Sequence, residues 1–409
     1  MRRAGLAVVV CAICACMALA QPDDRVAAQA VNGVHAQQGR RGTSSVRASA
    51  IPAGAARRWR KMPSPNTSLD DQLLGVSCKG PDWCMAVGYS ATGPFPAYLV
   101  LTEAWNGRSW SVVSYSGLPD SAFQYLNGIS CVSRNWCMAV GRYFPGGTGS
   151  NLAELWNGSS WSQTPTPDVS SNDQLDAISC VTVSFCMAVG DGAGTLTEVW
   201  NGSAWSLVPS PDAGSRPSSD QARGVSCTSP GFCMMLDRYD SGPVQKTAID
   251  LWNGASWSAL RTPNPGPATN SLNGVYCLSA RSCAAVGAES RSLRDATALV
   301  ENWNGLSWSV EPMPSEIASD YLLNVACTTD RRCAAVGDRI TRGFPGEMRT
   351  LAESSRDNIW LFGRTASPSP TGSALNDVSC GSTSLGHTYC VAVGYRGTRK
   401  GTATLAERY

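Results

Sequence analysis

The 409-residue sequence contains only two histidines, His35 and His387, so it offers few side chains that could act as a general base at neutral pH. It also lacks a Gly-x-Ser-x-Gly nucleophile elbow, a phosphate-binding loop, a dinucleotide-binding fingerprint and a cluster of metal ligands. These absences disfavour serine hydrolases, nucleotide-dependent enzymes and metalloenzymes, and we expect no cofactor and no bound metal. Carboxylate-based chemistry stays open, because paired acids leave no characteristic spacing in a sequence.

Charge is also scarce. Charged residues make up 16% of the chain, the formal net charge is +2, and basic and acidic residues are interspersed. A nucleic-acid-binding protein would carry a basic patch or stripe, so we expect no nucleic-acid partner. The low charge, together with 40 glycines and 24 prolines, is typical of an exported all-β protein.

The long apolar run of the chain lies at its N-terminus. Residues 1–20 combine a basic start at Arg2 and Arg3 with an apolar core and the small-residue sequence Ala18-Leu19-Ala20. This pattern is typical of a secretory signal peptide, and the run is too short to span a bilayer comfortably. We predict a secreted, extracellular protein without a transmembrane segment after signal removal. The sequence before Cys16 loosely resembles a lipoprotein cleavage box, so lipid anchoring at Cys16 is the alternative.

Residues 21–57 are rich in Ala, Gln, Arg, Gly and Ser and have no hydrophobic periodicity, which predicts a disordered leader.

A repeat fills the rest of the chain. Its first cysteine recurs every 47 to 53 residues, at Cys78, Cys131, Cys180, Cys227, Cys277, Cys327 and Cys380. Each period holds four short apolar runs separated by turn-forming residues, which is typical of a propeller blade.

The two ends of the repeat complement each other. The last copy stops at Tyr409 without a fourth strand, whereas the segment 58–65, before the first copy, matches the fourth-strand pattern. We therefore predict an all-β fold for residues 58–409, a seven-bladed β-propeller of four-stranded antiparallel blades. The ring would be closed by the N-terminal strand pairing with the C-terminal blade, which removes an open sheet edge. This arrangement resembles the closure of WD-repeat propellers, in a secreted bacterial repeat protein, and points to no specific named family.

Cysteines follow the repeat closely. Three of the 17 lie in the predicted signal peptide, and the other fourteen fall two per repeat. Each pair would join the first hairpin of its blade, because facing residues of antiparallel strands lie at a distance that a disulfide can bridge. The predicted disulfides are Cys78–Cys84, Cys131–Cys137, Cys180–Cys186, Cys227–Cys233, Cys277–Cys283, Cys327–Cys333 and Cys380–Cys390. Metal binding is the disfavoured alternative, since His387 is the only histidine near any pair.

Every third strand carries an acid in a Leu-x-Glu-x-Trp pattern. The acids are Glu103, Glu154, Glu198, Asp250, Glu301, Glu353 and Glu407. A ring of seven carboxylates could suggest catalysis or cation binding. An acid repeated in every blade, however, more simply answers a need shared by every blade, such as an unpaired backbone N–H or a neighbouring hydroxyl. We therefore assign these acids a structural role and expect Glu198→Gln to lower the melting temperature.

A Trp-Asn-Gly-x-x-Trp-Ser sequence follows in five repeats, as at Trp105 and Trp110. Asn-Gly indicates a tight turn, because both residues tolerate positive φ. The spacing resembles the Asp-box of sialidase-type propellers, which closes the same hairpin and is structural there. The regular placement of the tryptophans predicts that most of them pack in the core. Trp83 and Trp136, whose equivalents vary between repeats, are expected to be more exposed.

Function should be located where the repeat varies. The loops between strands two and three, and those between blades, vary in length and content and would lie together on one face, around the mouth of a central channel. The residue five after each second cysteine also changes between blades. These positions form the predicted ligand-binding ring of Tyr89, Arg142, Asp191, Arg238, Asp338 and Tyr395. Such a ring could bind a small or sugar-like ligand, or could be a solvated rim with none.

Two functions follow from this pattern. We favour an exported, monomeric binding or interaction scaffold that uses the variable face to bind an extracellular protein partner or a glycan. The alternative is a carbohydrate-active hydrolase or lyase with a carboxylate-based site at the channel mouth, where Asp191 and Asp338 would be the acids to inspect. The sequence does not decide whether the protein is an enzyme, although the scarcity of catalytic motifs argues against it.

Overall fold

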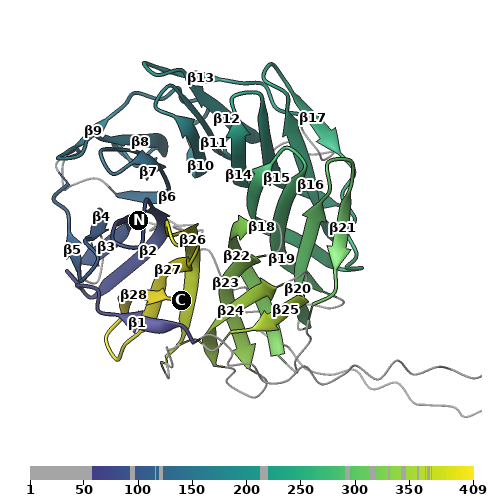
Figure 1. Ribbon diagram of the computed structural model, residues 1–409. Coiled ribbons are helices and arrows are strands. Elements are labelled where there is room, and N and C mark those ends of the chain that lie inside the picture. The colour runs from purple at the N-terminus through teal and green to yellow at the C-terminus, as the bar shows by residue number, and fades with distance from the viewer. Residues whose placement is uncertain are drawn as a thin grey trace, which may run out of the picture. The chain divides into compact units, whose positions relative to one another are not determined.

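The computed structural model describes residues 58–409, apart from 93–96, 116, 119–122, 212–219, 291–294, 314–317, 330–331, 342–346, 357–358, 364, 366–368 and 370. The predicted signal peptide, the predicted leader and Cys16 lie outside the described residues. The described part contains 28 strands and no helix, and therefore no helix that could cross a membrane. The strands form seven antiparallel blades of four strands each, arranged in a ring (Figure 1).

The blades follow one another along the chain. Blade 1 comprises β2 (Asp70–Cys78), β3 (Cys84–Thr92), β4 (Ala97–Trp105) and β5 (Trp110–Val112), and blade 2 comprises β6 (Gln124–Ser133), β7 (Trp136–Tyr143), β8 (Ser150–Trp156) and β9 (Trp161–Gln163). Blade 3 comprises β10 (Gln174–Thr182), β11 (Phe185–Asp191), β12 (Thr195–Trp200) and β13 (Trp205–Leu207), and blade 4 comprises β14 (Gln221–Ser229), β15 (Phe232–Ser241), β16 (Val244–Trp252) and β17 (Trp257–Leu260). Blade 5 comprises β18 (Thr269–Ser279), β19 (Ser282–Ser290), β20 (Ala296–Trp303) and β21 (Trp308–Glu311), and blade 6 comprises β22 (Ala318–Thr329), β23 (Arg332–Thr341), β24 (Met348–Arg356) and β25 (Ile359–Phe362).

Blade 7 joins the two ends of the described chain. It comprises β26 (Ser373–Ser382), β27 (Thr388–Gly397), β28 (Thr402–Arg408) and, as its fourth strand, β1 (Arg60–Met62). The register of β1 and β28 pairs Lys61 with Glu407, and the Trp59 and Tyr409 rings stack 5.5 Å apart. The predicted ring closure is therefore confirmed, and β1 lies beside β28 in Figure 1.

The hydrophobic core lies between neighbouring blades rather than in one central mass. In one such cluster, Met85 and Val87 of β3 pack against Leu126 and Ile129 of β6, on the next blade. Six further clusters repeat this arrangement around the ring. Because each blade buries its apolar surface only against its two neighbours, the stability of every blade depends on the ring being complete.

A serine ladder also links the blades near their disulfides. The backbone N–H of Cys131 donates a 3.0 Å hydrogen bond to the hydroxyl of Ser77 on the preceding blade. The same bond, at 2.9 to 3.1 Å, joins Cys180 to Ser130, Cys227 to Ser179, Cys277 to Ser226 and Cys78 to Ser379. Tyr276 and Ala326 replace the serine in blades 5 and 6. The Ser-Cys pair of the repeat therefore serves contacts between blades as well as the disulfide.

The second-strand glycine is explained by an irregularity in the first strand. In blade 3 the register of β10 and β11 shifts between Leu175 and Ala177. This brings the carbonyl oxygen of Gln174 to within 2.0 Å of the position that a β-carbon on Gly190 would occupy. Only glycine leaves room for that carbonyl, so the recurring Gly marks a β-bulge in its partner strand.

The Asn-Gly turns have a different basis from the one predicted. Gly107 has a φ of 90°, but Asn106 is not in the positive-φ region. Asn106 instead caps the turn with its side chain, whose Oδ1 accepts hydrogen bonds from the N–H groups of Arg108 and Ser109. The same capping recurs at Asn157, Asn201, Asn253 and Asn304. The turn is therefore an Asx-type turn, in which the side-chain oxygen of the asparagine is the acceptor.

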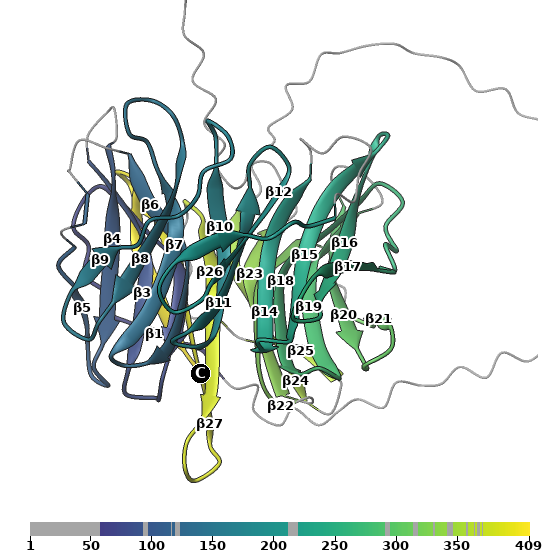
Figure 2. The ribbon, with the colours of Figure 1, turned by 90° about the horizontal axis from the view of Figure 1, so that it is seen from above.

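All seven predicted disulfides are confirmed, with Cα–Cα distances of 3.9 to 4.1 Å. They lie at one end of the blades together with the Asn-Gly turns, on what we call the hairpin face. The loops between strands two and three and between blades lie at the other end, the variable face (Figure 2). Seven disulfides indicate folding in an oxidising compartment.

Candidate functional site on the variable face

The six residues of the predicted ring occupy one register position. Each pairs with the residue that precedes the first cysteine by six positions on the innermost strand of its blade. The pairs are Tyr89 with Gln72, Arg142 with Tyr125, Asp191 with Gln174, Arg238 with Gln221, Asp338 with Tyr321 and Tyr395 with Ala374. They therefore lie at one level of the blades, near the end of the second strand on the variable face.

The six positions have different surroundings. Arg142, Asp191 and Arg238 lie on consecutive blades and share one set of polar neighbours, whereas Asp338 lies three blades beyond Asp191. The Asp338 side chain is buried, and its charged neighbour is Asp320, which itself pairs with Arg339 at 2.6 Å. The charged groups that act on Asp191 lie on blades 3 and 4 and do not include Asp338.

The two tyrosines of the ring, Tyr89 on blade 1 and Tyr395 on blade 7, lie near each other. Burial, followed by the neighbouring Tyr98, Asp70, Tyr395 and Tyr125, raises the pKa of Tyr89. The Tyr395 hydroxyl lies 3.4 Å from the Met348 sulfur. Tyr89 therefore stays neutral and presents a hydroxyl group and an aromatic ring rather than charge.

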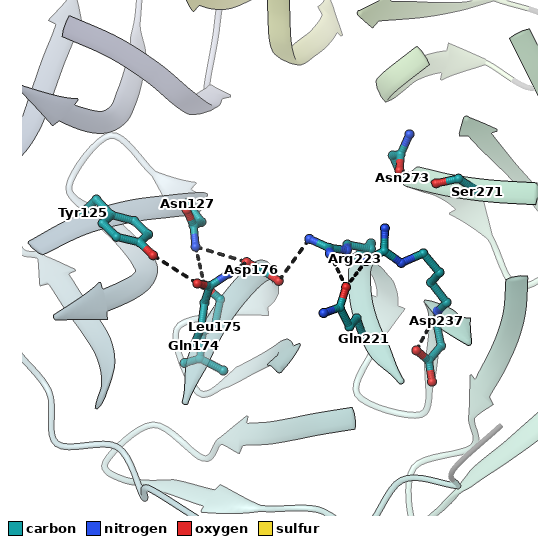
Figure 3. A network of polar contacts seen from close by, with 11 residues as sticks. Tyr125, Asn127, Gln174, Leu175, Asp176, Gln221, Arg223, Asp237, Ser271 and Asn273 are labelled. Atoms are coloured by element: carbon teal, nitrogen blue, oxygen red, sulfur yellow. Dashed lines mark hydrogen bonds and ion pairs between the residues drawn. The ribbon is translucent and has the colours of Figure 1, made fainter. Parts of the chain in front are cut away.

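The inner strands of blades 2 to 4 carry a continuous polar network that sequence reasoning missed. The Tyr125 hydroxyl lies 3.1 Å from Gln174 Oε1, and the Gln174 amide donates to Asp176. Arg223 lies 3.8 Å from the Asp176 carboxylate. The guanidinium groups of Arg223 and Arg238 both donate to Oε1 of Gln221. We call Tyr125, Gln174, Asp176, Gln221, Arg223 and Arg238 the axial network (Figure 3).

Alternation along the innermost strands explains how these residues meet. Asn127, Asp176 and Arg223 each stand four positions before the first cysteine of their blade, and the residue before each is a buried Leu or Ala. Asn127 joins the strands by donating to the carbonyl oxygen of Leu175 at 3.0 Å and to Asp176 at 3.2 Å. The signal for these residues in the sequence is their variation between repeats beside an apolar position.

Electrostatics at the axial network favour neutral carboxyl groups. Burial raises the pKa of Asp176, and the positive charge of Arg223 only partly opposes this. Burial and the adjacent Asp176 raise the pKa of Asp191 to about 7. Three arginines, Arg142, Arg223 and Arg238, therefore lie near two aspartates whose pKa values are raised.

Asp237 is turned away from this network. It takes the place of the second-strand glycine in blade 4 and is fully buried. Its carboxylate accepts a 2.7 Å hydrogen bond from the Thr195 hydroxyl and a 2.6 Å bond from the Arg238 N–H. Asp237 therefore links blades 3 and 4 and positions the backbone of Arg238.

The third-strand acids are buried between blades and away from the axis. Glu103 accepts a 2.6 Å hydrogen bond from the Ser64 hydroxyl, and Glu154 a 2.8 Å bond from the Tyr115 hydroxyl. Glu198 accepts a 2.8 Å bond from the Asn151 amide, a donor that was not foreseen. Burial raises the pKa to about 7 for Glu103, Glu154, Asp250 and Glu301, and to about 8 for Glu198. Their fixed place in the interface between blades supports the structural role.

The tryptophans follow the prediction as well. Twelve of them are buried, whereas Trp83 and Trp136 are partly exposed on the hairpin face. Within the described ranges, no three His, Cys, Asp or Glu side chains lie close enough to hold a metal ion.

Comparison with models of protein families finds no match, and a search of curated proteins finds none either. Among solved structures, the chain is similar to YCF48 bound to D1 peptide, with 12% identity over 86% of this chain and 97% of that one and a TM-score of 0.52. YCF48 from Cyanidioschyzon merolae (13% identity, 86% and 98% covered) and the WD40 repeats of RRP9 (12%, 86% and 97%) give the same TM-score of 0.52. At these identities the similarity is one of fold, that of a β-propeller.

Proposed function

We propose that this chain is an exported binding protein that holds a polypeptide segment at the axial network on the variable face. The observation that carries the proposal is the network itself. It gathers guanidinium and carboxyl groups, together with amides and a phenol, on the two innermost strands of three consecutive blades. Such groups match the amides, carboxylates and ammonium groups of a polypeptide.

The pattern suits binding better than turnover. Arg223 is held by Asp176 and Gln221, so it is fixed in orientation in the manner of a recognition site. Among the proteins of similar fold, YCF48 has been captured with a peptide. A β-propeller is a common scaffold for such binding, and the seven disulfides are consistent with a secreted protein.

The test is a screen of the exported chain against a random peptide library and a glycan array, with two arginine variants. Arg223→Gln removes the charge at the axial network. Arg134→Gln is the matched control, because Arg134 forms an ion pair with Asp82 at 2.6 Å on the hairpin face. We expect peptides to be enriched, and Arg223→Gln alone to weaken them about tenfold or more, which is about 1.4 kcal/mol. Enrichment of glycans alone, or equal loss in both variants, would overturn the proposal.

One observation favours a second function, a carboxylate-based hydrolase or lyase. Asp191, with its pKa raised to about 7, lies beside Asp176 and could remain protonated as a general acid at neutral pH. A panel of glycoside substrates tests this alternative. Turnover that is lost in Asp191→Asn and retained in Arg134→Gln would establish it, and absence of turnover across the panel would exclude those substrates.

A further inference from the structure

A row of four aromatic rings crosses blades 1 and 2 on the variable face. Tyr89 and Tyr98 have ring centroids 5.0 Å apart at 85°, Tyr98 and Phe123 are 5.8 Å apart at 46°, and Phe123 and Phe144 are 6.2 Å apart at 77°. We call these four residues the aromatic row. The row is distinct from the tryptophan pairs of the blades, which lie beside the Asn-Gly turns on the hairpin face.

The aromatic row is continuous with the axial network. The guanidinium carbon of Arg142 lies 4.3 Å from the centre of the Phe144 ring. Arg142 also pairs in register with Tyr125, the first member of the network, and its charge acts on Asp176. The backbone N–H of Phe144 donates a 2.9 Å hydrogen bond to the carbonyl oxygen of Phe123, which continues the pairing of β6 and β7 by one residue. Arg142 therefore stands at the junction of the nonpolar and polar surfaces.

The exposure of Phe123 shows that the aromatic row is not part of the buried core. Its side chain is 44% exposed, whereas twelve of the fourteen tryptophans are buried and the other two are only partly exposed. A chain that buries most of its tryptophans, yet exposes Phe123 beside three partly covered rings, presents a nonpolar surface to a partner.

The angles between the rings indicate what that partner presents. No two neighbouring rings of the row are parallel, since the interplanar angles are 46° to 85°. A sugar needs a flat, open aromatic face, whereas an incoming aromatic side chain adds naturally to an edge-to-face series. The adjoining polar surface carries Arg223 and Arg238, and the neighbouring Asp176 and Asp191 have raised pKa values, so the surface complements an acidic group.

We propose that the aromatic row is the nonpolar half of the ligand site, and that the ligand is a polypeptide segment carrying an aromatic side chain near an acidic one. This inference rests on the proposed function. The aromatic side chain packs against Phe123 and Tyr98, and the acidic side chain binds the arginines of the axial network, with Arg142 between them.

The test starts from peptides selected on the exported chain from a random library, followed by affinity measurements with a synthetic consensus peptide. We expect the consensus to combine an aromatic and an acidic residue. Phe123→Ala should weaken binding about tenfold or more, because a few aromatic anchors carry most of the binding energy of an interface. Phe123→Tyr should retain affinity, since it keeps the ring. Leu306→Ala is the control, because Leu306 is 89% exposed in a turn of the hairpin face.

The outcomes separate the two proposals. Selected peptides without an aromatic residue, or equal affinities for Phe123→Ala and Leu306→Ala, overturn the aromatic site. If those peptides still depend on Arg223, the proposed peptide-binding function stands alone. Selection of no peptide overturns both. Binding of a glycan that depends on Phe123 would show that the row stacks sugar rings and would overturn the peptide assignment.

Discussion

The backbone N–H of Cys78 donates a 3.1 Å hydrogen bond to the hydroxyl of Ser379, although the two residues are 301 positions apart in the chain. This bond completes the serine ladder across the junction of blades 7 and 1. Beside it, Asp377 accepts a 2.6 Å hydrogen bond from the Val76 N–H, and Asn376 donates at 2.8 Å to the carbonyl oxygen of Leu73. Hydrogen bonding between inner strands therefore closes the ring in addition to β1.

Ser379→Ala should destabilise the ring by about 1–3 kcal/mol, because it leaves the Cys78 N–H buried without an acceptor. Chemical denaturation of the native and variant chains measures the effect. Ser206→Ala is the matched control, since Ser206 is exposed on the outer strand β13. Equal stability of the two variants would contradict a structural role for the ladder.

The buried third-strand acids predict that stability falls as the pH rises. The pKa of Glu103, Glu154, Asp250 and Glu301 in the folded chain is about 7, against an ordinary value of about 4 for a carboxyl group. The folded state therefore holds more protons than the unfolded state between these values, so the free energy of unfolding decreases with rising pH across that window. Thermal melts from pH 5 to pH 8 should show this decrease, and a rise would contradict it.

Glu198 offers a single-residue version of the same experiment. Burial, together with Asp168, raises its pKa to about 8. Glutamine keeps the oxygen that accepts from Asn151 and never ionises. In the native chain, ionisation of Glu198 lowers the free energy of unfolding by up to about 1.4 kcal/mol per pH unit, and the Glu198→Gln variant should lack this contribution. We expect it to be no more stable than the native chain at pH 5 and more stable above pH 8, whereas the sequence alone predicted a lower melting temperature without reference to pH.

Gly190→Ala should cost about 3 kcal/mol or more, because a β-carbon there would lie 2.0 Å from the carbonyl oxygen of Gln174. Denaturation midpoints measure the loss. Gly231→Ala serves as the control, since the nearest atom to its added β-carbon is the Ser229 hydroxyl oxygen at 3.8 Å. If the two alanine variants were equally stable, the bulge would not be the reason for the repeated glycine.

Ligand binding at the axial network should depend on Asp191. Its neighbours are Asp176, Arg223, Arg238 and Asp237, and its pKa is raised to about 7. Loss of its proton adds a negative charge beside the arginines, so affinity for an acidic peptide should fall between pH 6 and pH 8. Asp191→Asn should remove most of that decrease. Titration calorimetry at several pH values makes the measurement, and an unchanged pH profile in the variant would exclude Asp191 as the cause.

Most of the fold could be predicted because the same pattern of cysteines and apolar runs recurs in seven blades. The spacing of the cysteines gave the hairpins and disulfides, and the unmatched segment before Cys78 gave the closing strand β1. Each of these features is local or periodic, so composition and spacing carry it. The role of Asn106 was predicted wrongly, because a positive-φ turn and a side-chain-capped turn share the same Asn-Gly signature.

The candidate site could be predicted only in part. The variable position after the second-strand glycine led to Arg142, Asp191 and Arg238, which the structure places beside the axial network. Asp176 and Arg223 were missed because they lie inside a strand that otherwise alternates as a core strand would. The aromatic row was missed because its members come from four segments whose contact depends on how the loops of two blades meet.

Ring closure through β1 has a consequence for biogenesis. Among the described strands, β1 is synthesised first but acquires its partner last, since β28 ends at Arg408. While the intervening blades assemble in order, β1 stays unpaired, and folding cannot be completed before nearly the whole chain has been made. A truncated chain would therefore expose that edge and the uncovered flank of blade 1, which makes it a target for proteolysis.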